Sequence, residues 1–243
     1  MTDNQDRIET SSRHLHIGTL LYDDIDQIDV TGPFEVLSRI TNATHRLYAP
    51  TDLVVRDIKG LRINADGTIS DAPQLDVLHV PGGPGQEALM DDKMVLEWLR
   101  SQATGATAVL SVCTGVLLLG AAGLIIGRRA TTRWAAHHLL SWFGACAVNE
   151  RVVRDGTYMF TAGVTAGIDG ALRLAADLRG QAEAELIQLS IAYAPEPPFN
   201  SGTPETAPIV VLEAARHAGK DLAARRLATA QRISAALRIP RRL

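Results

Sequence analysis

The chain contains 243 residues, of which 46% are hydrophobic and 21% charged, as in ordinary globular proteins and unlike in disordered chains. This length is enough for one large α/β domain with a well-buried core. The net charge of −3 favours neither nucleic acid nor a membrane surface as a partner.

The polar N-terminus contains acidic residues and does not have the pattern of a signal peptide. The longest apolar run, 115–127, is too short to span a bilayer. The two cysteines, Cys113 and Cys146, lie in different sequence settings and lack the spacing of a metal site. A cytoplasmic protein with reduced thiols is therefore expected.

Apolar runs and helical spacings alternate along the chain, with glycine, proline and aspartate between them. In chain order they first predict a strand at 14–22, a short helix with Pro33 in its first turn, and short β-like stretches within 44–69. A strand at 75–80 then leads into the glycine-rich segment 81–85. A helix from about 87 to 102 and a strand at 107–112 follow. After these we expect a buried helix, a helix at 131–143, a hairpin at 151–161, helices at 165–178 and 181–193, an irregular stretch to 208 and a basic helix from about 209.

Strands that alternate with helices, several of them fully apolar, indicate a parallel sheet covered by helices on both faces. The predicted organisation is one α/β domain at 14–208, a polar tail at 1–13 and a basic helical extension at 209–243. Residues 213–243 hold eight Arg or Lys against two acids. They lack interleaved aromatic residues and paired recognition helices, so we interpret them as a solvated helix face or a partner-subunit contact and expect no nucleic acid partner.

Cys113 lies where a buried strand runs directly into a helix. Ligands of open α/β sheets collect at the carboxyl ends of the strands, and a helix N-terminus stabilises a thiolate and lowers the pKa of a cysteine. Gly115 nearby has no side chain that would crowd a ligand. This position favours a reactive thiol over an inert buried cysteine, whereas Cys146 is expected to be structural.

Two further segments end at the same edge of the predicted sheet. Gly82 and Gly83 follow the neighbouring strand and can direct N–H groups into a shared pocket, so an oxyanion-binding turn and an ordinary strand-ending turn both stay open. Asp29 lies between apolar residues near the end of the first strand, which favours a desolvated carboxyl group suited to proton transfer. Capping of the next helix by Asp29 or Thr31 is the alternative.

A Cys–His hydrolase needs an imidazole beside its thiol. The residue after Cys113 is Thr114, and the adjacent His137 and His138 cannot both face one site from a helix. Peptide hydrolysis is therefore disfavoured.

Several motifs together resemble the DJ-1/PfpI superfamily, and most closely its isocyanide hydratases, from about residue 15 to 208. They are DQIDVTGP (26–33), VPGG (80–83), SVCTG (111–115), GAAGL (120–124), RATT (129–132), ERVVRDG (150–156), TAGID (165–169) and YAPEPPFN (193–200). The resemblance implies a flavodoxin-like parallel-sheet sandwich of the class I glutamine amidotransferase-like type. One departure is Arg133, where related sequences tend to have His, which affects the pocket wall or a subunit contact.

The resemblance also implies an activity: a hydro-lyase that adds water to a small-molecule isocyanide and releases an N-substituted formamide through a covalent cysteine thioimidate. Cys113 would be the nucleophile and Asp29 the acid and base, with Thr114 beside them. The implied substrate-binding residues are Gly82, Gly83, Val164 and Thr165. No metal or organic cofactor is implied, and members of the superfamily commonly form homodimers.

Two other functions stay open. One is a DJ-1-like thiol stress sensor or glyoxalase-type enzyme. The other is a fragment of an AraC-type regulator, which would need a DNA-binding region after the α/β domain. Only 35 residues follow Pro208, too few for paired helix-turn-helix units, so we expect an enzyme.

Overall fold

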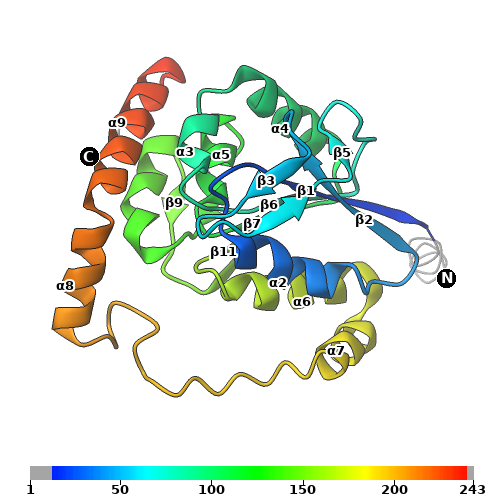
Figure 1. Ribbon diagram of the computed structural model, residues 1–243. Helices are drawn as coiled ribbons and strands as arrows, with labels where there is room; N and C mark the ends of the chain where they lie inside the picture. Colours follow the sequence, from blue (N-terminus) through cyan, green and yellow to red (C-terminus); the bar gives the residue numbers. More distant parts are fainter. Residues whose placement is uncertain (1–12, 240–243) are drawn as a thin grey trace.

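The computed structural model describes residues 13–239, with a seven-stranded sheet at the centre (Figure 1). The strand order is β10-β11-β7-β6-β1-β2-β5, and every pair of neighbours is parallel except the antiparallel β10–β11 hairpin. The strands of this sheet are β1 (Leu15–Leu20), β2 (Ala43–Ala49), β5 (Gly67–Thr68), β6 (Val77–Val80), β7 (Ala108–Val112), β10 (Val152–Asp155) and β11 (Tyr158–Thr161). Two small sheets pair β3 (Val54–Arg56) with β4 (Arg62–Asn64), and β8 (Arg129–Ala130) with β9 (Cys146–Ala147).

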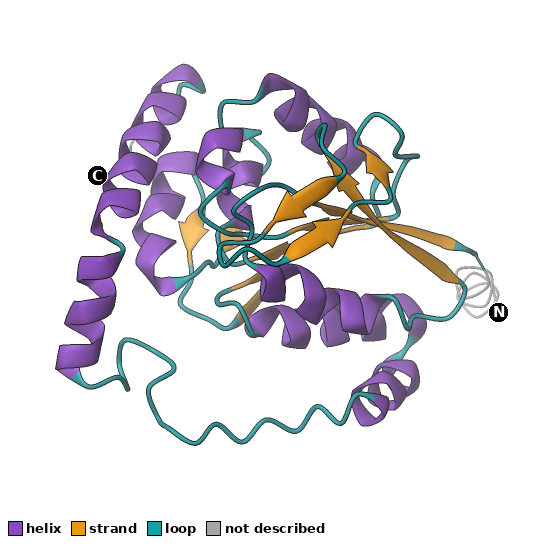
Figure 2. Cartoon of the chain, viewed as in Figure 1, coloured by secondary structure: helices purple, strands orange, loops and turns teal. Residues whose placement is uncertain are grey.

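Helices cover both faces of the sheet (Figure 2). The helices are α2 (Gln27–Leu37), α3 (Gln86–Leu89), α4 (Lys93–Gly105), α5 (Gly115–Ala121), the 3₁₀ helix η1 (Trp134–Phe143), α6 (Ala166–Arg179), α7 (Gln181–Ser190), α8 (Ile209–Ala218) and α9 (Lys220–Ala236). One apolar cluster joins the sheet to α2, α6 and α7, and the other joins it to α4, α5, η1 and α9. This arrangement confirms the predicted fold class. Within the described residues, no helix has the length and apolarity needed to cross a membrane.

The three central strands bring distant segments of the chain to one edge of the sheet. Strand β6 lies between β1 and β7, and Val80 at its end is in register with Ser111 of β7. Because the three strands run parallel, the segments that follow them emerge side by side. These segments contain Asp29, Gly82 and Cys113.

Helix α2 begins earlier than predicted. Asp26 caps the helix by accepting a hydrogen bond from the Ile28 N–H at 3.3 Å, a role that the sequence left open as an alternative for Asp29 or Thr31. Pro33 therefore lies inside the helix rather than in its first turn. Asp29, predicted near the end of a strand, lies in the first turn of α2 and is held by a helix.

Two segments predicted as single helices are each divided. The 87–102 segment forms α3 and α4, because Asp92 accepts a hydrogen bond from the Val95 N–H at 3.1 Å and starts a new helix. The segment after 208 forms α8 and α9, which meet at Gly219. The hairpin at 151–161 and the two helices α6 and α7 are confirmed.

Candidate active site

Cys113 follows β7 and has a left-handed backbone conformation, with φ of +55°. Such a conformation costs on the order of 1–2 kcal/mol for a residue with a side chain. Two hydrogen bonds hold it: the Cys113 N–H donates to the Thr161 carbonyl at 3.1 Å, and Thr132 Oγ1 donates to the Cys113 carbonyl at 2.6 Å. The thiol is thus fixed between β7 and α5, and the residue is only 3% exposed.

Asp29 reaches the same place from α2. Its side chain is buried, and Oδ2 accepts a hydrogen bond from the Gly82 N–H at 2.9 Å. In the part of the chain that the structure describes, Oδ1 has no hydrogen-bond partner. A buried carboxylate oxygen without a donor favours the protonated form of the group.

The pKa of Asp29 is raised to about 7. The main cause is burial, which disfavours the charged carboxylate, and the negative charge of Asp26 adds to the increase. The Gly82 N–H and the neighbouring Cys113 thiol lower the pKa of Asp29. Asp29 therefore changes its protonation state near neutral pH, as a group that transfers protons in catalysis should.

Burial also raises the pKa of the Cys113 thiol, and the charge on Asp29 raises it further. Arg133, the backbone N–H of Thr114 and Arg226 lower it. Because a charge on either Cys113 or Asp29 opposes a charge on the other, the two groups titrate as a coupled pair. Near neutral pH this pair holds at most one negative charge.

The glycine-rich turn after β6 joins Asp29 to the cysteine turn. The Gly83 N–H donates to Thr114 Oγ1 at 3.2 Å, and a Cβ on Gly82 would lie 2.6 Å from the Thr114 nitrogen and 2.8 Å from Asp29 Oδ2. Gly83 has φ of +138°, which favours glycine. Both N–H groups already donate to protein oxygens, so in this structure the turn positions Asp29 and Thr114 rather than presenting free donors to an oxyanion.

Gly115 has a different role from the one predicted. A Cβ at this position would lie 2.1 Å from the Val80 carbonyl oxygen and 2.7 Å from that of Pro81. The glycine lets the start of α5 approach the end of β6, so backbone packing explains it, and space for a ligand does not.

Val164 and Thr165 precede α6. Val164 is partly buried and packs against the apolar cluster that contains Val112 and Cys113. Thr165 is exposed, and its hydroxyl accepts a hydrogen bond from Arg151 at 3.3 Å. The structure therefore brings Val164 to the cluster around the thiol and ties the Thr165 hydroxyl to an arginine.

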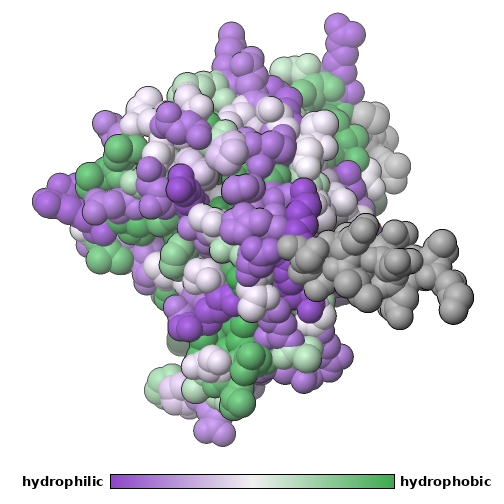
Figure 3. All heavy atoms as spheres, turned by 90° about the vertical axis from the view of Figure 1, so that its right-hand side faces the viewer, coloured by the Kyte–Doolittle hydropathy of each residue, from purple (hydrophilic) through white to green (hydrophobic). Residues whose placement is uncertain are grey.

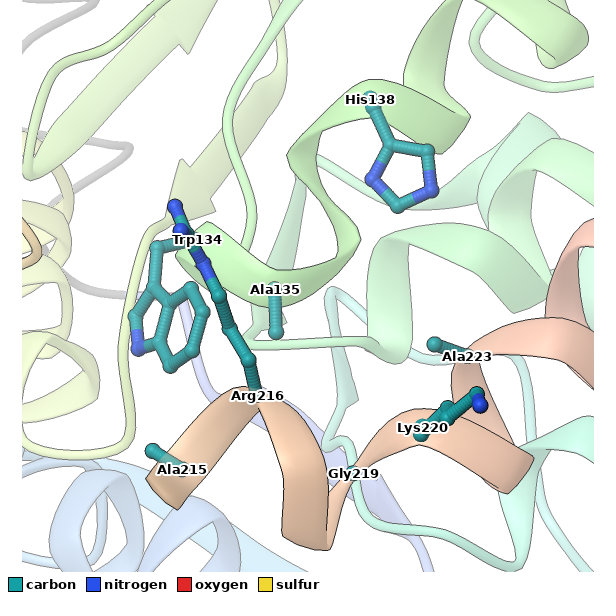
Figure 4. Close-up of a pocket in the computed structure, with 8 residues that line it drawn as sticks. All are labelled: Trp134, Ala135, His138, Ala215, Arg216, Gly219, Lys220 and Ala223. Atoms are coloured by element: carbon teal, nitrogen blue, oxygen red, sulfur yellow. The ribbon is translucent and has the colours of Figure 1, made fainter. Parts of the chain in front are cut away.

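A separate cavity of about 400 Å³ lies between η1 and the junction of α8 and α9 (Figure 4). It is lined by Trp134, Ala135, His138, Ala215, Arg216, Gly219, Lys220 and Ala223, none of which was a predicted site residue.

The ring of His137 lies 3.0 Å from the Val148 carbonyl oxygen. The side chains that shift the pKa of Cys113 most strongly are Asp29, Arg133 and Arg226, and none is a histidine.

Arg226 of α9 is a site residue that sequence reasoning missed. The basic C-terminal segment was interpreted as solvated or as a subunit contact, but Arg226 is only 7% exposed, and its Nη2 donates to the Gly83 carbonyl at 2.9 Å. The available signal was the spacing of Arg226, Thr229, Ala230 and Ile233, which form the buried face of α9.

With this geometry established, comparison with known proteins identifies the family. The chain matches the DJ-1/PfpI family over residues 16–177. It belongs to this family. An isonitrile hydratase of Pseudomonas putida is 49% identical over 202 residues, which cover 83% of this chain and 89% of that protein. A glutathione-independent glyoxalase of Caenorhabditis elegans is 26% identical over 161 residues, or 65% of this chain and 85% of that protein.

Solved structures of the DJ-1/PfpI family agree with the fold. A THiJ/PfpI family protein from Pseudomonas syringae superposes with a TM-score of 0.87 at 36% identity, covering 89% of this chain and 90% of that one. The DJ-1/PfpI match at 16–177 includes Asp29, Gly82, Cys113 and Val164, but it ends before Arg226. The contribution of α9 therefore lies outside the segment that defines the family.

Proposed function

We propose that this protein is an isocyanide hydratase, a hydro-lyase that converts an isocyanide and water into an N-substituted formamide. The observation that carries the proposal is the Cys113 thiol, held in a strained turn beside the buried carboxyl group of Asp29. The 49% identity to the Pseudomonas putida isonitrile hydratase supports the same reaction.

In the first half of the proposed reaction, Cys113 transfers its proton to the ionised Asp29 as sulfur bonds to the terminal carbon of R–N≡C. Asp29 then gives that proton to the same carbon. The product is a thioimidate, in which the Cys113 sulfur is bonded to CH=N–R. The raised pKa of Asp29, about 7, suits it both to accept and to release the proton.

In the second half, Asp29 takes a proton from water while the water oxygen bonds to the thioimidate carbon. That proton passes to the nitrogen. The carbon–sulfur bond then breaks, the remaining proton of the water returns to the Cys113 sulfur, and R–NH–CHO leaves. Water thus supplies the formyl oxygen and two protons, and the enzyme returns to its starting state.

The other site residues support these steps. The Gly82 N–H holds Asp29 in place, and the Thr114 N–H favours the thiolate of Cys113. Val164 would offer an apolar contact to the R group, with Gly83 and Thr165 at the turns around it. Because Cys113 is only 3% exposed, the site favours an electrophile with a narrow, linear end, such as the isocyanide carbon.

The direct test is to incubate the purified protein with cyclohexyl isocyanide and to follow N-cyclohexylformamide by ¹H NMR, with an aryl isocyanide in parallel. We expect formamide to accumulate over many turnovers, with ¹⁸O from labelled water in its formyl group. The absence of formamide from both substrates would overturn the proposal. Conversion of methylglyoxal to a hydroxy acid in the absence of formamide would instead favour a glyoxalase.

A further inference from the structure

Helix α9 presents one buried charged side chain to the site. Its inward face consists of Arg226, Thr229, Ala230, Ile233 and Ser234, and the remaining residues of the helix are more exposed. Apolar contacts of Ala230 and Ile233 attach this face to the core cluster that includes α5 and η1. Arg226 therefore sits in a fixed position beside the site and not on a free helix surface.

The Arg226 guanidinium contacts both turns that form the site. Its Nη2 lies 2.9 Å from the Gly83 carbonyl oxygen and 3.3 Å from Thr114 Oγ1. These are the two residues that already share the Gly83 N–H to Thr114 Oγ1 bond. One arginine thus links α9 to the glycine-rich turn and to the residue that follows Cys113.

Unlike two other arginines of α9, Arg226 has no ion-pair partner among the described residues. Arg225 lies 3.6 Å from a Glu87 oxygen, and Arg232 binds Asp91 with both terminal nitrogens, at 2.7 and 2.6 Å. In the described part of the chain, no carboxylate lies within ion-pair distance of Arg226, and its Nε has no hydrogen-bond partner. A buried cation without a counter-ion is costly, so a compensating negative charge is expected nearby.

The site supplies that charge. Four other ionisable side chains shift the pKa of Arg226, Cys113 or Asp29, and these are Tyr22, Asp26, Glu87 and Arg133. The Tyr22 hydroxyl donates a hydrogen bond to the Pro81 carbonyl at 2.8 Å. Glu87 accepts a hydrogen bond from the Thr229 hydroxyl and forms an ion pair with Arg225. Arg133, which also lowers the pKa of Cys113, is an exposed residue, so Arg226 is the buried cation that acts on the Cys113 thiolate.

We propose that Arg226 is a positioning residue through which α9 completes the active site. Its guanidinium holds Thr114 and the Gly82–Gly83 turn in place and acts as the counter-ion of the Cys113 thiolate when that thiolate forms. This inference rests on the proposed role of Cys113 as nucleophile. It assigns to the C-terminal helix a part in thiolate formation that the family match does not include.

The test uses the intact chain and measures thiolate formation directly. The rate constant of Cys113 alkylation by iodoacetamide, located by peptide mass spectrometry, is measured at fixed pH values from 7 to 10 in wild type, R226Q, R226M and R226K. The matched control is R225Q, which removes the exposed neighbouring guanidinium. Circular dichroism establishes that each variant is folded, and formamide production is measured in parallel. Because alkylation needs no isocyanide, failure of this inference is distinguishable from failure of the proposed function.

We expect the rate constant at a given pH to fall by about tenfold or more in R226Q and R226M, which is the loss of thiolate that a rise of one unit in the pKa of Cys113 produces. In R226K, which keeps the charge but loses the planar fork, the rate constant should fall by less than about threefold. R225Q should match wild type. Formamide production should fall in all three Arg226 variants and least in R226K.

A folded R226Q or R226M with the wild-type rate constant at each pH would overturn the proposal, because a purely structural role would lower stability without changing thiolate formation. If neither neutral variant folds, R226K decides. A rate constant more than about tenfold below wild type in R226K would then contradict a counter-ion role.

Discussion

In the proposed mechanism, Asp29 prepares the Cys113 thiol for reaction without an imidazole. The left-handed backbone of Cys113 places its side chain at the end of β7, and Asp29 enters from the first turn of α2. Burial raises the pKa of both groups, so that the pair carries at most one negative charge near neutral pH. The proton therefore has a short path between sulfur and carboxylate, and neither group needs a bulk-water relay.

The pH dependence of catalysis follows from the pKa of Asp29. Because the monoanionic pair forms as pH rises through about 7, kcat/KM for an isocyanide should increase with pH, about tenfold per unit below the midpoint, and level off above it. In D29N this inflection should disappear, and the residual rate should be lower by about 100-fold or more. Initial rates from pH 5.5 to 9 provide the measurement. A wild-type profile flat through pH 7 would contradict the assignment.

The same carboxyl group should lower stability at neutral pH. Its folded-state pKa of about 7 lies above the ordinary aspartate value of 3.8, so the folded state holds more protons between these values and stability falls as pH rises through them. D29N lacks this titration. The free energy of unfolding of D29N and of wild type is measured with urea at pH 5 and at pH 8. The difference between the two proteins should be about 2 to 3 kcal/mol more in favour of D29N at pH 8 than at pH 5. An unchanged difference would show that Asp29 is not desolvated.

At this scale, sequence reasoning identified Cys113 and Asp29 because both follow apolar strands. It assigned Gly115 to ligand space when the cause is the approach of α5 to the Val80 carbonyl. It missed Arg226, since a charged residue within a basic segment is ordinarily solvated, and only the partners contributed by distant turns show otherwise.

Among the elements, the glycine-rich turn after β6 carries the most contacts of the site. It binds Asp29 of α2 through Gly82, Thr114 through Gly83, and Arg226 of α9 through the Gly83 carbonyl. A turn with larger side chains could not lie this close to the cysteine turn. The geometry of the site thus depends on backbone contact between two turns more than on any one side chain.

Gly82→Ala should therefore disturb the site. The added Cβ would lie 2.6 Å from the Thr114 nitrogen and 2.8 Å from Asp29 Oδ2, and neither turn can move freely. We expect a loss of about 1–3 kcal/mol in stability and a decrease in kcat of about tenfold or more. Gly202→Ala, whose Cβ would meet no atom within 4 Å, is the control and should leave both unchanged. Wild-type activity in G82A would show that the contact between the turns is dispensable.

Element boundaries show where local patterns were insufficient. The hairpin turned at Gly156 and the helices after it followed from turn chemistry and helical spacing. The start of α2 was misplaced because Pro33 resembles a first-turn proline, whereas the cap belongs to Asp26 seven residues earlier. The division of the last helix at Gly219 was not predicted, because the two parts share a helical composition.

At the scale of the whole molecule, apolar side chains remain exposed on α7, the 191–208 segment and α8. The most exposed are Leu186, Leu189, Phe199, Ile209 and Val210, with Leu189 and Phe199 at 78% and 79%. Figure 3 shows an apolar patch at the lower end of the molecule, where α7 and the 191–208 segment lie in Figure 1. Patches of this kind are typical of surfaces that contact another protein.

We therefore keep the expectation of a homodimer as a prediction, with a second copy of the chain covering this surface. Sedimentation velocity at micromolar concentration should give the mass of two chains. L189E, in the patch, should shift the distribution towards monomer by weakening association about tenfold or more. L53E, at an exposed apolar residue near β3, is the matched control and should remain dimeric. A monomeric wild type would contradict this prediction.

The two cysteines of the chain allow the most direct test of the central claim. Cys113 is buried at the site, and Cys146 is an exposed free thiol in β9. Formamide production from cyclohexyl isocyanide is to be compared in C113A, C146A and wild type at pH 8. A Cys113 nucleophile predicts a decrease of at least about 1,000-fold in C113A and a rate within about twofold of wild type in C146A. A C113A variant that retains a tenth or more of the wild-type rate would contradict it.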